Sequence, residues 1–307
     1  MMIDSRKPEW LRVRMGATPA YGELKSRLRS LHLHTICEEA KCPNISECWG
    51  GGTATVLLMG DICTRGCRFC AVKTANPMRI LDREEPERVA RSVAESGLTY
   101  VVLTSVDRDD LADGGAGHIA RTVMLIKEMS DVRVEVLMPD FRGSRDSLDA
   151  VVGSGADVLA HNVETVRRLT PSVRDRRAGY DQSLDVLRYL KDRSGRITKT
   201  SIMVGLGETR EEVTEAMRDI RDAGVDALTI GQYLRPGQRH LPVAEYVNPA
   251  TFAEYEAEAR ALGFAMVASG PFVRSSYRAG ELYLEGLLAG GPVTAVGEPG
   301  VKQFSGR

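Results

Sequence analysis

The sequence lacks several features, and each absence excludes a class of protein. Its 307 residues contain no apolar run that approaches the roughly 18 residues of a membrane span. Basic and acidic residues number 41 and 42, so the basic field of a typical nucleic-acid-binding protein is missing. Aromatic residues make up 6%, too few for platforms that stack single strands. The start has no apolar segment typical of a secretory signal, and we expect a cytoplasmic protein without a membrane or nucleic-acid partner.

Cysteine is scarce as well, but its distribution is informative. The six cysteines form two groups of three with none left over: Cys37, Cys42 and Cys48, spaced C-x4-C-x5-C, and Cys63, Cys67 and Cys70, spaced C-x3-C-x2-C. Neither group has the four ligands of a closed zinc site or of an ordinary 4Fe–4S site. Three thiolates on one loop can bind three irons of a cubane and leave the fourth iron open to a small molecule. The two groups therefore predict two 4Fe–4S clusters.

Other interpretations of the cysteines stay open on the residues alone. A zinc site could borrow a distant fourth ligand, although zinc loops more often use C-x2-C pairs. A ferredoxin-like electron carrier would be smaller and would have four thiolates per cluster. A disulfide framework suits short secreted chains. Buried cysteines that only fill space are expected in apolar runs, whereas Cys63 and Cys67 lie among Thr, Arg and Gly.

Strands and helices are expected to alternate through most of the chain. Short apolar runs predict buried strands at residues 53–59, 100–104, 132–138, 157–161, 201–206 and 227–230. Amphipathic stretches predict helices at residues 85–96, 116–129, 144–152, 182–191, 211–223 and 252–262, three of them followed by Gly97, Gly224 and Gly263. Such alternation implies right-handed βαβ units. Six units predict an α/β fold, a partial (β/α)6 TIM-like barrel. A seventh apolar run, at residues 264–268, follows the last unit.

The two ends of the chain do not share this alternation. Residues 1–50 contain one amphipathic helix candidate, at 21–31, together with the first three cysteines. They predict an N-terminal extension that packs across the barrel and binds one cluster. Residues 51–288 are the predicted barrel with a C-terminal segment near the site. Residues 289–307 have no apolar periodicity and are predicted to be a flexible tail.

Polar motifs follow the predicted strands at their carboxyl ends. The cysteine loop, residues 60–70, follows the first strand directly. Further motifs follow the second, fourth, fifth and sixth strands, at residues 104–110, 162–164, 205–209 and 232–236. In barrels of this kind the loops at the carboxyl ends of the strands form the active site. We therefore expect these motifs to meet at one mouth.

The C-x3-C-x2-C loop is the signature of the radical S-adenosylmethionine (SAM) enzymes, and the chain resembles one of their families, the lipoyl synthases. The resemblance covers about residues 5 to 288 and rests on both cysteine groups, Trp49 and the motifs at 104–110, 159–165, 204–209, 232–236 and 270–277. In the superfamily, the open iron holds SAM and reduces it, and the resulting 5′-deoxyadenosyl radical abstracts hydrogen from unactivated carbon. A biotin synthase-like enzyme would share this logic but not the C-x4-C-x5-C spacing.

The resemblance implies a sulfurtransferase of lipoate biosynthesis and protein lipoylation. It would insert sulfur at C6 and C8 of an octanoyl-lysine on a carrier protein and use two SAM per product. The cluster on Cys63, Cys67 and Cys70 would generate the radical. The cluster on Cys37, Cys42 and Cys48 would donate the sulfur, with Ser275 as the ligand of its fourth iron. The implied partners are the lipoyl-bearing subunits of 2-oxoacid dehydrogenases, the H protein of the glycine cleavage system, an electron donor and an iron–sulfur repair carrier.

SAM itself needs polar groups for its ribose, amino group and carboxylate. We expect these groups at or near the strand ends around the mouth, from Thr104, Ser105, Asn162, Glu164, Lys199 and Gln232. The acidic residues between 107 and 113 do not have the spacing of a calcium loop and predict a solvated, hydrogen-bonded loop. Some of them could orient SAM.

Four further features carry weaker expectations. The segment 205–207 begins like a dinucleotide-binding motif, but Arg210 replaces the last glycine. His32 and His34 are expected to be structural, while His161 could equally be a core hydrogen-bonding group or a functional one. The basic run at 174–177 predicts a solvated face or a docking patch for an acidic protein.

Overall fold

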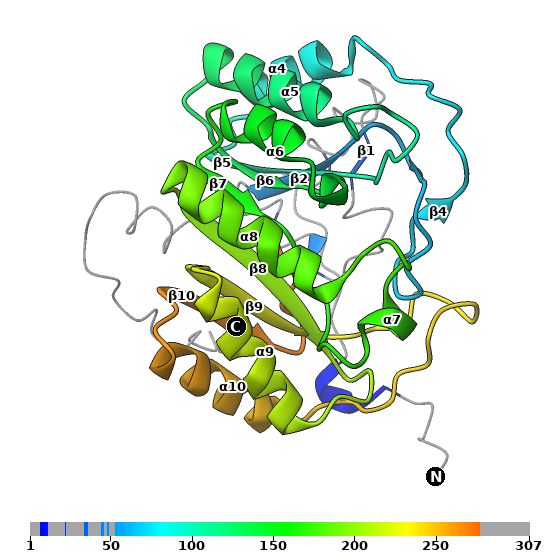
Figure 1. Ribbon diagram of the computed structural model, residues 1–307, viewed down its shortest axis with the longest axis vertical. Helices are drawn as coiled ribbons and strands as arrows, with labels where there is room; N and C mark the ends of the chain where they lie inside the picture. Colours follow the sequence, from blue (N-terminus) through cyan, green and yellow to red (C-terminus); the bar gives the residue numbers. More distant parts are fainter. Residues whose placement is uncertain are drawn as a thin grey trace, which may run out of the picture.

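A curved, mostly parallel sheet is the framework of the protein. The computed structural model describes residues 7–11, 22, 34–35, 44–45, 48 and 53–276. In Figure 1 the main helices follow one another around the strands in chain order, from α4 at the top to α10 at the bottom. Short elements, η1 (Glu9–Leu11), β3 (Ile62–Cys63), β4 (Lys73–Thr74), η2 (Phe141–Gly143) and α7 (Thr170–Val173), lie in the connections.

Seven parallel strands make up the sheet, and a short antiparallel strand, β1 (His34–Thr35), pairs with its first edge. The seven are β2 (Thr53–Leu58), β5 (Tyr100–Ser105), β6 (Arg133–Leu137), β7 (Val158–Ala160), β8 (Ile197–Val204), β9 (Ala227–Gln232) and β10 (Met266–Gly270). Each strand lies next to the one before it in the chain. All carboxyl ends therefore point to one side of the molecule.

The helices that connect these strands are α4 (Glu85–Glu95), α5 (Ala116–Met129), α6 (Arg145–Val152), α8 (Tyr180–Ser194), α9 (Arg210–Asp222) and α10 (Pro249–Ala261). Local sequence explains several of their ends. Thr209 and Glu212 form a capping box at the start of α9, where each side chain accepts a hydrogen bond from the other residue's backbone N–H. Gly97, Gly224 and Gly263 have φ values of 69°, 82° and 88° just past three helices, as predicted.

The predicted six βα units are confirmed, with two differences in the strands. The seventh apolar run leads into a strand, β10, which pairs with β9. The fifth strand was predicted at residues 201–206, but β8 begins earlier, at Ile197. The prediction missed its first half because Thr198, Lys199 and Thr200 are polar, although all three are at most 1% exposed. A buried lysine needs a charged partner, and Lys199 has one inside the barrel.

The interior of the barrel differs from its outer layers. Two large apolar clusters fill the space between strands and helices. Inside the barrel, Tyr100, Val102, Val158, Ala227 and Met266 form a third, small cluster. In the same interior, the Lys199 Nζ atom lies 2.9 Å from both oxygens of Glu135, and the Tyr100 hydroxyl donates to that carboxylate at 2.6 Å.

Parts of the N-terminal extension are described. His34 and Thr35 pair with Leu57 and Val56, which places this piece of the extension on the edge of the barrel. The helix predicted at 21–31 lies outside the described residues apart from Gly22, as do His32, Cys37, Cys42 and the predicted tail. The domain boundaries stay a prediction. Among the residues that the structure describes, no helix is long and apolar enough to cross a membrane.

Candidate functional site

The loop that carries three cysteines leaves the first parallel strand at its carboxyl end. Met59 and Gly60, with φ values of 66° and 82°, turn the chain out of β2. Cys63 then forms part of β3, and the Cys70 N–H donates to the Cys67 carbonyl at 3.1 Å. The thiols of Cys63, Cys67 and Cys70 are partly buried and form no disulfide.

Two of the sulfurs accept hydrogen bonds from backbone N–H groups. The Arg65 N–H points at the Cys63 Sγ atom at 3.4 Å, and the Asp175 N–H points at the Cys67 Sγ atom at 3.3 Å. Hydrogen bonds to the sulfurs are one way in which a protein tunes an iron–sulfur cluster. The second donor comes from a residue more than 100 positions away, so the barrel itself orients this sulfur.

Burial holds the three thiols in their protonated form when no cation is near. It raises the pKa of Cys63 and Cys67 to about 12 and raises the pKa of Cys70 as well. Such thiols become thiolates only when a cation replaces the proton, as iron does. No three His, Cys, Asp or Glu side chains in the described ranges lie close enough together for one metal ion. Cysteines that each bind a separate corner of a cubane do not converge on one point, so the donor set fits a cluster.

Arg65, in the middle of the cysteine loop, anchors the loop to the connections that follow β5 and β6. Its guanidinium donates to both oxygens of Asp140, at 2.8 and 2.7 Å, and to both oxygens of Asp109, at 2.9 and 3.0 Å. Its Nε atom also lies 3.2 Å from an oxygen of Asp107. The arginine side chain is only 3% exposed. A buried, doubly bidentate guanidinium fixes the loop by geometry as well as by charge.

Loops from the second half of the barrel also bind the cysteine loop. The Gly66 N–H donates to Asp175 at 2.8 Å, and the Arg177 guanidinium donates to the Thr64 carbonyl at 2.7 Å. A ring nitrogen of His240 lies 2.9 Å from the Cys70 carbonyl. Figure 1 shows this arrangement on the right, where β4, α7 and the yellow loop after β9 lie together.

Backbone strain is concentrated at the same end of the barrel. Six residues other than glycine have φ values between 45° and 71°: Met59, Met78, Arg79, Phe141, Arg142 and Glu164. All of them lie in connections that follow the carboxyl ends of strands. Such conformations cost about 1–3 kcal/mol each and persist only where the surroundings fix them, which happens most often at functional sites.

The structure divides the six residues predicted to bind SAM into two groups. Thr104, Ser105, Asn162 and Glu164 lie at or just after the ends of β5 and β7, and none is fully buried. The Ser105 hydroxyl has no hydrogen-bond partner in the described part of the chain. The Asn162 side chain donates to Glu164 at 3.0 Å, and burial raises the pKa of Glu164. These groups fit a polar ligand beside the cysteine loop.

The other two predicted residues are occupied elsewhere. Lys199 is the third residue of β8 and not at a strand end, and its ammonium group is paired with Glu135. Gln232 is 1% exposed. Its side chain accepts from the Val247 N–H at 2.8 Å and donates to the Glu245 carbonyl at 2.9 Å. Both side chains therefore stabilise the scaffold. The sequence alone could not distinguish this structural role from a role in SAM binding.

The segment that contains Ser275 packs against the barrel at a point where only glycine fits. A Cβ atom on Gly231 would lie 2.2 Å from the Val273 carbonyl oxygen. From the N-terminal extension, the Asn44 side chain donates to the Phe272 carbonyl at 2.6 Å. The stretch that contains Cys48 and the stretch that contains Ser275 are thereby joined.

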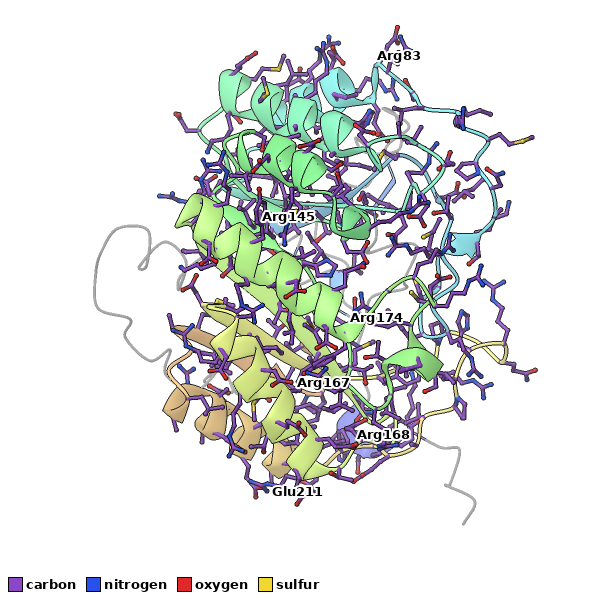
Figure 2. All side chains as sticks on the ribbon, in the orientation of Figure 1. Arg83, Arg145, Arg167, Arg168, Arg174 and Glu211 are labelled. Atoms are coloured by element: carbon purple, nitrogen blue, oxygen red, sulfur yellow. The ribbon has the colours of Figure 1, made fainter. Side chains whose placement is uncertain are left out.

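Two expectations about charged loops were wrong in part. The acidic loop after β5 is hydrogen-bonded as predicted and Asp113 is exposed, but Asp109 and Asp107 are not solvated, because their side chains are 8% and 23% exposed and surround Arg65. The run 174–177 is not only a solvated face. Arg174, beside the start of α8 in Figure 2, is 7% exposed and donates to Ser183 at 2.7 Å.

His161 is a core hydrogen-bonding group. Its Nδ1 atom lies 2.9 Å from the Met138 carbonyl and must donate to it, so the neutral ring accepts at Nε2, which lies 3.0 Å from the Ser183 hydroxyl. Burial and the Arg174 guanidinium lower the pKa of His161 to about 4. The ring is therefore neutral at ordinary pH.

The sequence did not reveal several residues that position the cysteine loop. Asp140, Asp175 and His240 all hold the cysteine loop, yet none was predicted. Asp140 follows the third strand in the same way that the predicted motifs follow theirs, so the rule of strand ends could have found it. Asp175 lies inside the basic run 174–177 and His240 lies well beyond β9, and nothing in the local sequence assigns either residue to the cysteine loop.

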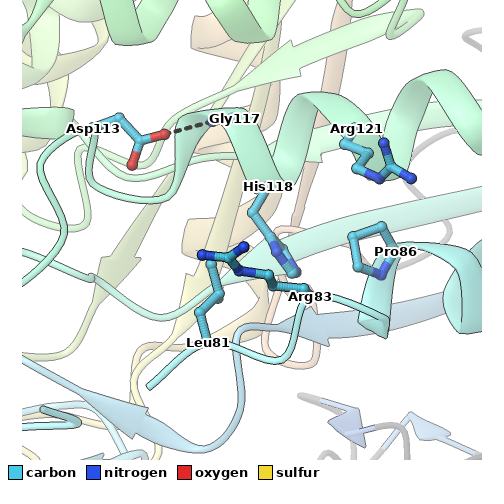
Figure 3. Close-up of a pocket in the computed structure, with 7 residues that line it drawn as sticks. All are labelled: Leu81, Arg83, Pro86, Asp113, Gly117, His118 and Arg121. Carbon is cyan, nitrogen blue, oxygen red and sulfur yellow. Dashed lines mark hydrogen bonds between the residues drawn. The ribbon is translucent and has the colours of Figure 1, made fainter. Parts of the chain in front are cut away.

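A separate hollow of about 480 Å³ lies between the starts of α4 and α5 (Figure 3). Apart from Arg83, its charged groups have partners: His118 contacts Glu85 at 2.6 Å, and Arg121 pairs with Glu87. Asp113 accepts hydrogen bonds from two N–H groups at the start of α5. We therefore assign this hollow no part in the chemistry.

Family models and relatives match this arrangement. Residues 57–231 match the radical SAM superfamily, and residues 3–42 match the N-terminal domain of lipoyl synthase. A lipoyl synthase of Anaeromyxobacter sp. (strain Fw109-5) is 58% identical over 291 residues, which cover 94% of this chain and 99% of that protein. This chain belongs to the lipoyl synthase family.

Another lipoyl synthase, from Thermus thermophilus, is 56% identical over 92% of this chain and 88% of its own length. The crystal structure of Streptococcus suis SuiB bound to S-adenosylmethionine has a TM-score of 0.56 at 11% identity, covers 80% of this chain and 59% of its own, and so shares the fold. As a lipoyl synthase, the chain is a radical SAM sulfurtransferase that uses SAM and 4Fe–4S clusters.

Proposed function

We propose that this lipoyl synthase inserts sulfur at C6 and C8 of an octanoyl-lysine on a lipoyl carrier protein, and that its six cysteines divide the work between two clusters. The C–H bonds at C6 and C8 have no neighbouring carbonyl to acidify them. Acid–base chemistry therefore cannot break them, and the bound cluster and SAM supply the radical chemistry that can. The observation that supports this best is the buried cysteine loop with its two N–H···S hydrogen bonds at the mouth of the barrel.

In this proposal, Cys63, Cys67 and Cys70 hold the cluster that binds SAM. Arg65 and its carboxylate partners keep the loop in one conformation, so that the three sulfurs are pre-positioned before iron arrives. The partly buried position of the loop limits the access of water to the site. Because the loop lies at the carboxyl end of the sheet, a substrate that enters the barrel mouth meets it directly.

We assign SAM binding to Thr104, Ser105, Asn162 and Glu164. Ser105 brings a buried hydroxyl without a partner in the described ranges, and Asn162 orients the Glu164 carboxylate. A desolvated carboxylate gains most from a ligand that donates hydrogen bonds, as ribose hydroxyls or an ammonium group do. Lys199 and Gln232 would act indirectly, by fixing strands β8 and β9.

The sulfur donor cluster would be held by Cys37, Cys42 and Cys48, with Ser275 as a fourth ligand. The hydrogen bond from Asn44 to the Phe272 carbonyl supports this, because it joins the two segments that would share the cluster. A hard serine oxygen would leave iron more readily than a thiolate. That suits a cluster that loses sulfur in the reaction.

The proposal also includes the partners. The acceptors would be octanoylated lipoyl domains of 2-oxoacid dehydrogenases and the glycine cleavage H protein, and an electron donor and an iron–sulfur repair carrier would complete the cycle. We propose a cytoplasmic location.

Substitution of one cysteine in each group tests the division of labour. Cys67→Ala should abolish reductive cleavage of SAM and, with it, sulfur insertion. Cys42→Ala should still cleave SAM but produce no lipoyl group, because radical generation does not need the donor cluster. Both products are measured by mass spectrometry after anaerobic incubation with reductant, SAM and an octanoylated peptide. Sulfur insertion by either variant would refute the proposal.

A further inference from the structure

Among the described residues, the two most exposed of the large apolar side chains lie on one turn. Met78 and Ile80 are 74% and 76% exposed, whereas the next most exposed large apolar residues, Met124 and Met129, are 48% exposed. We refer to residues 76–80 as the Met78 turn. Single exposed apolar residues are common, but two at this exposure on one turn are a candidate for a contact surface.

The turn is strained. Met78 and Arg79 both have left-handed conformations, with φ values of 57° and 59°, and the Ile80 N–H donates to the Pro77 carbonyl at 3.0 Å. This is the pattern of a type I′ turn, in which asparagine and glycine are strongly preferred. A methionine and an arginine in these left-handed positions destabilise the fold, whereas glycine would adopt the same conformation without strain. The strain is explained if the two side chains are needed at the surface.

A buried ion pair fixes the turn in this conformation. Arg108, which is 2% exposed, donates to both oxygens of Asp110, at 2.8 and 2.9 Å. The same guanidinium donates to the Ile80 carbonyl at 2.9 Å, and Asp110 accepts from the Arg79 N–H at 2.8 Å. The turn is therefore held rigidly, and Met78 and Ile80 project from a preformed surface, which lowers the entropic cost of binding.

The turn lies beside the cysteine loop. The Ala75 N–H donates to the Cys63 carbonyl at 3.1 Å. Three residues span at most about 11 Å, so Met78 lies no farther than that from Ala75. Anything that binds the Met78 turn is thus held next to the mouth of the barrel.

The turn and the segment before it carry basic charges, whereas the carboxylates of Asp110 and Asp82 beside the turn are already paired with Arg108 and Arg88. Between residues 68 and 80 every charged residue is basic: Arg68, Lys73 and Arg79. All three are exposed, and none has a carboxylate partner within the described ranges. Just beyond the turn the charges are mixed: Arg83, which projects from the upper edge of the molecule in Figure 2 and lines the hollow of Figure 3, lies between the exposed Asp82 and Glu84. An apolar pair flanked by unpaired basic groups fits a protein surface that presents an apolar patch beside acidic side chains.

We propose that the Met78 turn is the docking element for the acylated carrier, a folded domain with an acidic surface next to its octanoyl-lysine. Met78 and Ile80 contact the carrier, while Lys73 and Arg79 attract its carboxylates. This inference rests on the proposed function, because it names how the same site recognises its protein substrate.

The test compares two substrates for one double variant. Met78→Asn with Ile80→Thr removes the apolar contacts, while asparagine tolerates the left-handed conformation and threonine keeps a branched side chain. With an intact octanoylated carrier domain as substrate, KM should rise about tenfold or more, the effect of losing one interface hot spot. With a short octanoyl-lysine peptide, kcat/KM should stay within about twofold, because a peptide makes no contact with the turn.

Met124→Gln with Met129→Gln is the matched control, since it removes exposed methionines from α5 and should leave both substrates unaffected. Lys73→Glu with Arg79→Glu should also raise KM for the carrier and should weaken its dependence on salt. An unchanged KM for the carrier in the Met78 and Ile80 variant would overturn the docking role. If the wild type failed to convert even the peptide, the proposed function would fail first, and the docking role with it.

Discussion

Arg65 offers a quantitative test of how the cysteine loop is held. In Arg65→Gln the side chain loses its charge and most of its donors. The Asp140 carboxylate then stays buried without its guanidinium, whereas Asp109 keeps its contacts with Arg142 and Arg177. Removal of one partner from a buried ion pair costs about 3–5 kcal/mol. For a chain of this size, that corresponds to a fall in Tm of roughly 10 °C. The loop should also lose order, so the variant should hold less iron at the first cluster.

The control for this prediction is Arg142→Gln. Arg142 donates to the same Asp109 at 2.9 Å, but its side chain is 60% exposed, so its ion pair contributes only about 0–1 kcal/mol. Both variants are compared with the wild type by thermal unfolding under anaerobic conditions and by iron content after reconstitution. Equal losses of Tm in the two variants would refute the view that burial makes Arg65 the anchor.

Three further predictions concern other parts of the scaffold. His161 should make the free energy of unfolding depend on pH. Its pKa of about 4 in the folded protein lies below the ordinary 6.5, so as the pH falls the unfolded chain binds a proton before the folded protein does. The free energy of unfolding should therefore decrease by about 2 kcal/mol between pH 7 and pH 5. In His161→Asn the Tm should fall less over that range, and an identical slope would contradict this. Gly231→Ala should lower the free energy of unfolding by about 1–3 kcal/mol and should lower the iron content, because the new Cβ would lie 2.2 Å from a carbonyl oxygen. In the control Gly179→Ala the nearest neighbour lies 3.6 Å away, so both measurements should change little. Ser275→Ala should impair sulfur insertion more than Ser276→Ala, and wild-type activity of the former would exclude Ser275 as a ligand.

Much of the fold could be predicted because periodicity and apolar runs are local signals. The six βα units and the glycines after three helices followed directly from them. The first half of β8 was missed for a physical reason. Lys199 is buried only because Glu135 reaches it from another strand, and a pairing across 64 residues leaves no trace in the local pattern.

The candidate site could be predicted only in part. The cysteine loop and its position at a strand end followed from spacing and from the rule for parallel barrels. The residues that hold the loop, such as Asp175 and His240, act through one or two hydrogen bonds between distant segments. For the same reason Gln232 was predicted to bind SAM although it holds backbone, since a polar residue at a strand end can do either.

The most direct test of the central claim is the mass of an octanoyl-lysine peptide after anaerobic incubation with the reconstituted protein, reductant and SAM. The account predicts a product that has gained two sulfur atoms, with two SAM consumed for each. It predicts no sulfur-containing product from Cys42→Ala, in which SAM is still cleaved. SAM cleavage by the wild type without any gain of sulfur, or full sulfur insertion by the variant, would contradict the account.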